Sequence, residues 1–247
     1  GTGIGDLFDV TVMPVTGEVN YARGVIEDTT SGLWSPADRT QEVAKVGYYS
    51  VPLTRYGIKA EVTATARVGL HRYTFPEAAD AALVIDLENG GCWDASTETF
   101  MEAEGNNRVV GYRYSKGWAK NQRIYFVAEF AKPFDSFELK GNKDMYGRAS
   151  FSTTAGEEVM LKVAISPVSI EGAKLAMQTE LPGWDFAATQ EAAVAAWEKE
   201  LARVKVEMKD KQQKEIFYTA MYHMNIQPRN RTDDHGTWDD FHTIWDT

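Results

Sequence analysis

Cysteine and histidine are both scarce in this chain. Cys92 is the single cysteine among 247 residues, and there are four histidines. One cysteine excludes a disulfide within the chain, and a buried free thiol is the ordinary state of such a residue. Cys92 and the four histidines also lack the close spacing of a zinc site. The sequence therefore gives no sign of a zinc centre.

Basic residues are outnumbered, and long apolar runs are missing. Lys and Arg number 26 against 36 Asp and Glu, which gives a net charge of −10. Proteins that bind nucleic acid need a basic surface for the phosphates, so this class of partner is not expected. No apolar stretch approaches the length of a membrane span. The chain opens at Gly1 without a methionine, which is compatible with processing or truncation upstream.

The first two thirds of the chain have the pattern of β-strands. Short runs rich in Val, Tyr, Phe, Thr and Ile recur from Asp6 to about Ser169, separated by Gly, Pro and Asn. Residues 58–63 alternate between apolar and polar side chains, which favours an antiparallel sheet with one solvated face. No strand–helix–strand rhythm appears. Residues 1–180 are therefore predicted to form a large antiparallel β-sandwich.

The composition changes after the sequence Pro182-Gly183-Trp184. Residues 185–206 are rich in Ala, Glu and Lys, with Asp185 as the expected N-cap of a helix. A second helix is expected from about Lys211 to Ile226, and Pro228 ends it. The predicted units are a helical linker over residues 181–208 and the start of a larger helical domain over residues 209–247. Because the chain stops in what looks like the opening of another helix, we expect it to be a fragment.

Three local features carry weak functional signals. The N-terminal GTGIGD has glycines like those of nucleotide-binding loops, but no strand precedes it and no helix follows it, so a tight turn is favoured. His71 in a strand and His223 on the second helix are both expected to pack rather than to catalyse. Trp34 lies in the polar loop of residues 29–40. It is either a lid on the core or an exposed platform on which a sugar stacks.

The last part of the chain concentrates carboxylates and aromatic rings. Asp233, Asp234, Asp239 and Asp240 lie close to Trp238, and Trp245 and Asp246 follow. Aromatic rings stack on the apolar faces of sugars, and carboxylates accept hydrogen bonds from hydroxyl groups. Loops of this kind carry function more often than cores do. A solvated loop leading into a capped helix explains the same residues, and the spacing does not match an EF-hand calcium loop.

Several stretches along the chain resemble the N-terminal part of glycoside hydrolase family 92. They occur in the family's order and cover nearly the whole chain. They are GTG and GD within residues 1–6, PVTG at 14–17, GYYSV at 47–51, YGIKAEVTAT at 56–65, VGLHRYTF at 68–75, IS and VSIEGA within 165–173, FYTAMYH at 217–223 and WDT at 245–247.

The resemblance implies a fold, an activity and a cofactor. Family members are calcium-dependent, exo-acting α-mannosidases, often of the α-1,2 type, in which a β-sandwich is joined by helices to an (α/α)6 barrel. The resemblance further implies an inverting mechanism, a mannose-containing glycan as substrate, and a bacterial protein that is periplasmic, on the cell surface or secreted. The remainder of the catalytic domain would be the partner of the present residues.

The resemblance also implies where the site residues lie. The catalytic acid and base and most calcium ligands are expected downstream of Thr247, so none is assigned within the chain. Gly3, Trp34, Trp245 and Asp246 are the expected substrate-binding residues. Gly3 would lie near the sugar, Trp245 and Asp246 would hold the terminal mannose, and Trp34 would contact the leaving sugar.

Other functions fit the same residues. A non-catalytic carbohydrate-binding β-sandwich would use its Trp residues to stack on glycans. A purely structural sandwich would support a barrel and contact no ligand, and a glycoside phosphorylase with a sandwich and a barrel is a more distant alternative. The sequence that follows Thr247 separates the enzyme from the binding module, since a long helical continuation with separated Glu and Asp residues favours the enzyme.

Overall fold

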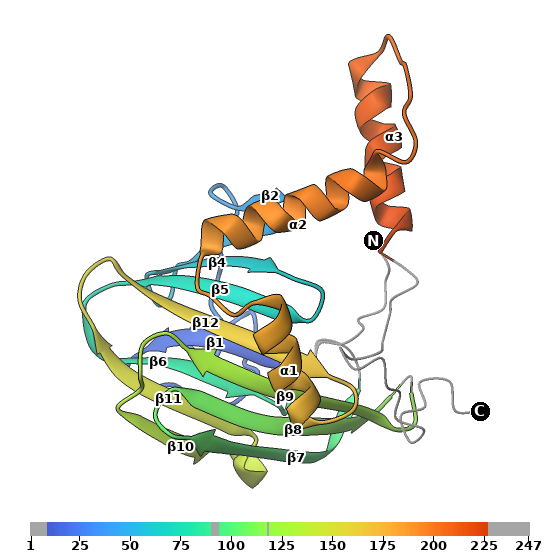
Figure 1. Cartoon of the computed structure of the whole chain (residues 1–247). Coiled ribbons are helices and arrows are strands. Elements are labelled where there is room, and N and C mark those ends of the chain that lie inside the picture. Colours follow the sequence, from blue (N-terminus) through green and yellow to red (C-terminus); the bar gives the residue numbers. More distant parts are fainter. Residues whose placement is uncertain (1–8, 90–93, 118, 227–247) are drawn as a thin grey trace.

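The computed structural model describes residues 9–89, 94–117 and 119–226 (Figure 1). These residues form twelve strands, one 3-10 helix and three α-helices. The strands are β1 (Thr11–Thr16), β2 (Val43–Lys45), β3 (Tyr48–Leu53), β4 (Ile58–Ala64), β5 (Val68–Phe75), β6 (Ala78–Asp86), β7 (Ala95–Glu104), β8 (Arg108–Lys116), β9 (Gln122–Phe130), β10 (Ser136–Lys140), β11 (Tyr146–Thr153) and β12 (Glu157–Ser166). The helices are η1 (Asn142–Asp144), α1 (Ile170–Glu180), α2 (Phe186–Leu201) and α3 (Lys211–Met224).

The strands form two antiparallel sheets that pack face to face. The small sheet has the order β1-β6-β11-β10, and the large sheet has the order β2-β3-β4-β5-β12-β9-β8-β7. The main core lies between them, where side chains such as Val15 and Leu83 of the small sheet meet Phe126 and Leu161 of the large sheet. The predicted antiparallel β-sandwich is confirmed.

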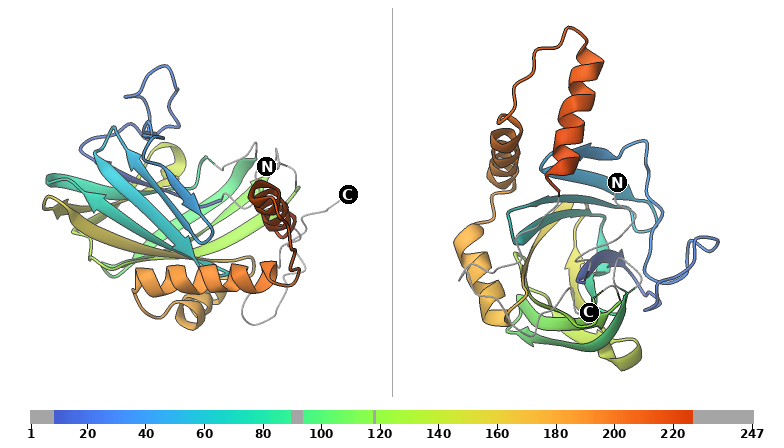
Figure 2. Two further views of the ribbon diagram at one scale, coloured as in Figure 1. Left: turned by 90° about the horizontal axis from the view of Figure 1, so that it is seen from above. Right: turned by 90° about the vertical axis from the view of Figure 1, so that its right-hand side faces the viewer.

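A second core covers the outer face of the large sheet. Neighbouring residues of a strand point to opposite faces, so Val109 of β8 enters the main core while Val110 enters the second one. The second core joins Val110 to Ala176 and Met177 of α1 and to Phe186 at the start of α2. Figure 2 shows α1 and α2 on this outer side of the large sheet.

Each of the three α-helices begins at a side chain that caps its backbone. Asp185 accepts a hydrogen bond from the backbone N of Ala188 at 2.9 Å, and Asp210 accepts one from Gln212 N at 2.8 Å. The two predicted helices and the N-cap Asp185 are thus confirmed. The sequence analysis did not predict α1, which begins after Ser169 and lies inside the range assigned to the sandwich.

Ionic groups fix the joint between the sandwich and α2. Glu180, at the end of α1, accepts hydrogen bonds from Thr65 Oγ1 at 2.5 Å, Arg67 N at 2.9 Å and Arg67 Nη1 at 2.7 Å. The guanidinium of Arg72 on β5 lies 4.4 Å from the ring centroid of Phe186, the first residue of α2. The joint is therefore held to the turn between β4 and β5 and to the face of β5.

Arg72 also pairs with a buried carboxylate on the neighbouring strand. Glu61 of β4 is only 4% exposed and accepts hydrogen bonds from Arg72 Nη2 at 2.9 Å and from Tyr48 Oη at 2.6 Å. Burial by itself would raise the pKa of Glu61, but the hydrogen bonds from Arg72, Tyr48 and Lys59 lower it to about 2. The expectation of a solvated face at residues 58–63 is wrong at Glu61, because α2 packs over this face.

The close approach of α2 depends on a glycine. Gly47, in the turn between β2 and β3, has a φ of +73°. A Cβ atom at this position would lie 3.0 Å from the Cβ of Ala193 in α2. Glycine at position 47 therefore allows both the positive φ of this turn and the close packing of α2.

We expect Arg72→Met to lower the free energy of unfolding by about 2–3 kcal/mol, because it leaves the buried Glu61 carboxylate without its main partner. Lys59→Met is the matched control. Lys59 also pairs with Glu61, at 3.2 Å, but its side chain is 50% exposed, so its loss should cost less than about 1 kcal/mol. Urea unfolding at pH 7 measures both values, and equal losses would contradict this account.

The same pair predicts a dependence of stability on pH. The pKa of Glu61 is lower in the folded protein than its ordinary value of 4.5, so its contribution to stability is complete above that pH. This contribution is lost as the pH falls from 4.5 toward 2. The loss of stability between pH 5 and pH 3 should be smaller in Arg72→Met than in the wild type.

Candidate functional site

A buried guanidinium ties together three segments at one end of the sandwich. Arg113 of β8 is 0% exposed. Its Nε donates to the carbonyl of Leu87 at 2.8 Å, and its Nη1 donates to Asp9 Oδ1 at 2.8 Å and to Asp94 Oδ2 at 2.6 Å. Asp9 precedes β1, while Leu87 and Asp94 flank the connection from β6 to β7. One cation therefore fixes both ends of that connection and the chain just after residues 1–8.

The surroundings of Arg113 keep the cluster charged and compact. Gln122 Nε2 donates to Asp9 Oδ2 at 2.7 Å. Burial raises the pKa of Asp9, whereas the hydrogen bond from Gln122 and the charge of Arg113 act against that rise. Burial also works against the charged form of Arg113, but its two carboxylate partners raise its pKa overall. A Cβ atom on Gly117 would lie 2.8 Å from the Cβ of Asp94, so this approach requires glycine.

The turn after β6 is fixed by a second carboxylate. Asp86 accepts hydrogen bonds from the backbone N of Glu88 at 2.9 Å and of Asn89 at 3.0 Å. Tyr146 Oη donates to Glu88 Oε2 at 2.6 Å and accepts from Asn89 Nδ2 at 2.8 Å. Burial raises the pKa of Asp86, in spite of the hydrogen bonds that it accepts. Together with Arg113, these groups define the rim of the sandwich, which consists of Asp9, Asp86–Asn89, Asp94 and Arg113.

Trp34 lies in a separate loop that Arg55 holds in place. The Arg55 guanidinium donates to the carbonyls of Thr30 at 2.8 Å, Gly32 at 2.9 Å and Trp34 at 3.0 Å. The Trp34 ring is partly buried, and its Nε1 donates to the carbonyl of Asp28 at 3.3 Å. Leu33, rather than Trp34, is the residue of this loop that joins the main core. The role of Trp34 in contacting a sugar stays a prediction.

The two histidines differ in their surroundings. His71 points into the sandwich, with its Nδ1 2.7 Å from Tyr73 Oη. Burial lowers the pKa of His71 to about 4, so the ring is neutral at pH 7. This confirms the expected packing role. His223 was expected to pack as well, but it is exposed on α3, which has no buried residue.

Three of the four predicted substrate-binding residues lie outside the described residues. These are Gly3, Trp245 and Asp246. The structure therefore places only Trp34, and its loop is distinct from the rim. The sequence analysis missed Arg113 and its carboxylate partners. A local signal for them is missing, because Asp9 and Asp94 lie 104 and 19 residues from Arg113 along the chain.

Within residues 9–89, 94–117 and 119–226, no group of three or more His, Cys, Asp or Glu side chains is placed to hold a metal ion. None of the helices described in these ranges has both the length and the apolar character needed to cross a membrane.

Two models of one protein family match the chain. The model of the glycosyl hydrolase family 92 N-terminal domain matches residues 1–166, and the model of its catalytic domain matches residues 172–247. The chain belongs to glycoside hydrolase family 92. The family 92 catalytic model thus begins within α1, just after the last strand of the sandwich. No match is found among proteins with curated functions.

Solved structures of family 92 members share this fold. The family GH92 α-mannosidase BT3965 from Bacteroides thetaiotaomicron is 33% identical, with a TM-score of 0.87 over 95% of this chain and 34% of its own. The family glycosyl hydrolase CcMan5 is 27% identical, with a TM-score of 0.78 over 93% of this chain and 33% of its own. The inverting mannosidase BT2199 from B. thetaiotaomicron, at 24% identity and a TM-score of 0.76, shares the fold over 92% of this chain and 31% of its own. The chain thus spans about a third of the length of these relatives.

We expect Arg113→Met to lower the free energy of unfolding by about 3–5 kcal/mol, because it leaves two carboxylates at the rim without their cation. Arg203→Met is the control, since the Arg203 side chain is 69% exposed and pairs with Glu200, three residues earlier in the chain. Its loss should change stability by less than about 0.5 kcal/mol. Denaturant unfolding compares the two variants, and a loss below about 1 kcal/mol for Arg113→Met would refute the proposed importance of the cluster.

Proposed function

We propose that the full-length protein is an exo-acting α-mannosidase that removes terminal mannose from glycans, with residues 1–247 supplying part of the sugar pocket. The observation that carries this proposal is the 33% identity to a family GH92 α-mannosidase over 95% of this chain. A structure of that relative in complex with mannoimidazole supports mannose as the sugar. The finer proposal is an enzyme of the α-1,2 type that acts in the periplasm, on the surface or outside a bacterial cell.

The sandwich rim is the part of the described structure that we assign to the sugar pocket. Asp9, held by Arg113, directly follows residues 1–8, which include Gly3. The family resemblance assigns Gly3, Trp245 and Asp246 to the terminal mannose and Trp34 to the leaving sugar. In this proposal Arg113 does not contact the sugar. Arg113 instead holds Asp9, which directly follows the residues that would contact the sugar.

The chemistry of glycoside hydrolysis with inversion needs two carboxyl groups. One protonates the glycosidic oxygen, and the other activates a water molecule on the opposite face of the ring, with a separation of about 6.5–9.5 Å between them. We assign neither role to a residue of this chain and place both downstream of Thr247. The family resemblance implies calcium in the complete enzyme, and we propose that its ligands also lie mostly outside the chain, in the remainder of the catalytic domain.

The activity is tested directly with the full-length protein and an aryl α-mannoside. We expect release of mannose, strong loss of the rate after treatment with a calcium chelator, and recovery when calcium is added back. Residues 1–247 alone should release none. Binding of mannosides by the full-length protein without any turnover would instead support a carbohydrate-binding module. Turnover by residues 1–247 alone would place the acid and base among Asp233, Asp234, Asp239 and Asp240.

The role of Asp246 separates sugar binding from helix capping. A hydrogen bond to a charged group contributes about 1.5–3 kcal/mol. If Asp246 accepts two such bonds from mannose in the transition state, Asp246→Ala in the full-length protein should lower kcat/KM by a factor on the order of one hundred or more. Its thermal midpoint should change little.

The matched control is Asp210→Ala, which removes the N-cap of α3. This change should cost about 1 kcal/mol of stability and leave the kinetics nearly normal. If Asp246→Ala behaves like the control, with a lowered midpoint and near-normal kcat/KM, Asp246 has a structural role.

A further inference from the structure

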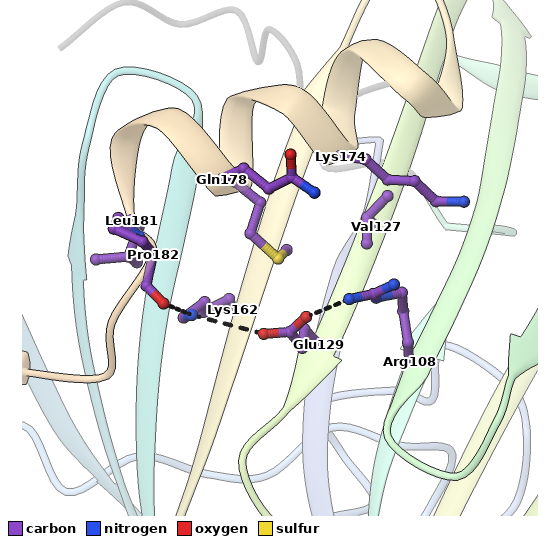
Figure 3. Close-up of a pocket in the computed structure, with 9 residues that line it drawn as sticks. Arg108, Val127, Glu129, Lys162, Lys174, Gln178, Leu181 and Pro182 are labelled. Carbon is purple, nitrogen blue, oxygen red and sulfur yellow. Dashed lines mark hydrogen bonds and ion pairs between the residues drawn. The ribbon is translucent and has the colours of Figure 1, made fainter.

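A pocket lies under α1, away from the rim and from the Trp34 loop. Its volume is about 210 Å³. Figure 3 shows α1 along one side and the strands of the large sheet along the other. Its lining residues come from β8, β9, β12 and the end of α1, and they are Arg108, Val127, Glu129, Lys162, Lys174, Met177, Gln178, Leu181 and Pro182. A cavity of about 150 Å³ is large enough for a molecule such as benzene, so this pocket has room for a small organic ligand.

The most buried charge of the pocket is the ammonium group of Lys162. The residue is 1% exposed. Its Nζ donates to the carbonyl of Pro182 at a long 3.4 Å, lies 3.6 Å from Glu129 Oε1, and sits 4.0 Å from the ring centroid of Trp184. An ammonium group has three N–H donors, and the two contacts of Lys162 Nζ with oxygen atoms are both longer than an ordinary hydrogen bond. A buried ammonium group with such long contacts is costly in free energy unless another acceptor is present.

One nitrogen of Arg108, another cation of the lining, has no acceptor. Arg108 Nη2 donates to Glu129 Oε2 at 2.7 Å, but the buried Nε of Arg108 has no hydrogen-bond partner. Buried donors without partners are rare in folded proteins. The lining therefore combines the long contacts of Lys162 with one buried nitrogen of Arg108 that has no partner.

The charges around the pocket favour an anion. The lining has three cations, Arg108, Lys162 and Lys174, against the single carboxylate of Glu129. Glu104, which is not part of the lining, pairs with Lys174 at 2.7 Å and with Arg108 at 3.7 Å. With both carboxylates counted, three cations and two anions give these five side chains a net charge of +1. The protein as a whole carries −10, so this local excess is unusual for the chain.

We propose that this pocket binds a small organic monocarboxylate. A carboxylate would balance the excess positive charge and supply an acceptor for Lys162 Nζ, whose present contacts with Pro182 and Glu129 are long. The apolar part of the ligand would lie against Met177, Leu181 and Val127. Because Lys162 also bonds the carbonyl of Pro182, such a ligand binds at the joint that leads from the sandwich to α2. This inference does not depend on the mannosidase activity.

The test uses the full-length protein, sodium propionate as the probe and propionamide as an uncharged probe of the same shape. Ligand-observed NMR titrations at constant ionic strength measure the two affinities. We expect saturable binding of propionate and at least tenfold weaker binding of propionamide. Lys162→Met should weaken propionate binding at least tenfold. Lys211→Met is the control, since that side chain is 90% exposed and should leave the affinity unchanged.

Three outcomes would overturn the proposal. They are no saturable binding of propionate to the wild type, equal binding of the amide, and binding that persists in a folded Lys162→Met variant. Circular dichroism shows whether that variant folds. If it does not fold, the comparison of propionate with propionamide on the wild-type protein decides the question by itself.

Discussion

The central strands of the large sheet carry apolar side chains on both faces, so both faces must be covered. The small sheet covers the inner face, where Phe126 and Leu161 are buried, and α1 covers the outer face over Val110 and Val127. Burial of apolar surface stabilises by about 25 cal/mol for each Å² removed from water. Helices α1 and α2 therefore pack as part of the sandwich, and their position on its outer face sets the direction in which the chain leaves it.

Buried polar groups add specificity to this apolar framework. The joint before α2 is held by Glu180 and by the pair of Glu61 with Arg72. The rim, which includes Asp9 just after residues 1–8, is held by Arg113. An arrangement that leaves one of these buried charges without its partner is costly. In the proposed function, the rim forms the sandwich side of the sugar pocket, and the joint sets the direction of the chain that follows the sandwich.

The elements that the sequence predicts well are those with local signals. Residues 58–64 alternate in polarity, and Asp185 precedes an Ala-rich stretch, so β4 and α2 could be recognised from short windows. The first helix could not, because α1 is only 11 residues long and follows directly on a strand-rich region, with Ser169 as its one clear signal. Arg113 resembles any polar residue of a strand, and its partners are distant in sequence. Most of the predicted sugar-binding residues, including Asp246, lie outside the described residues and stay predictions.

The most direct measurement of the central claim is a crystal structure of the full-length protein with mannoimidazole bound. The account predicts that the inhibitor ring lies between the catalytic domain and the sandwich rim, with contacts from the segment that precedes Asp9. It also predicts that Arg113 still joins Asp9 and Asp94 in that complex. A ring enclosed by the catalytic domain alone, with no contact from the sandwich, would contradict the claim that the sandwich supplies part of the sugar pocket.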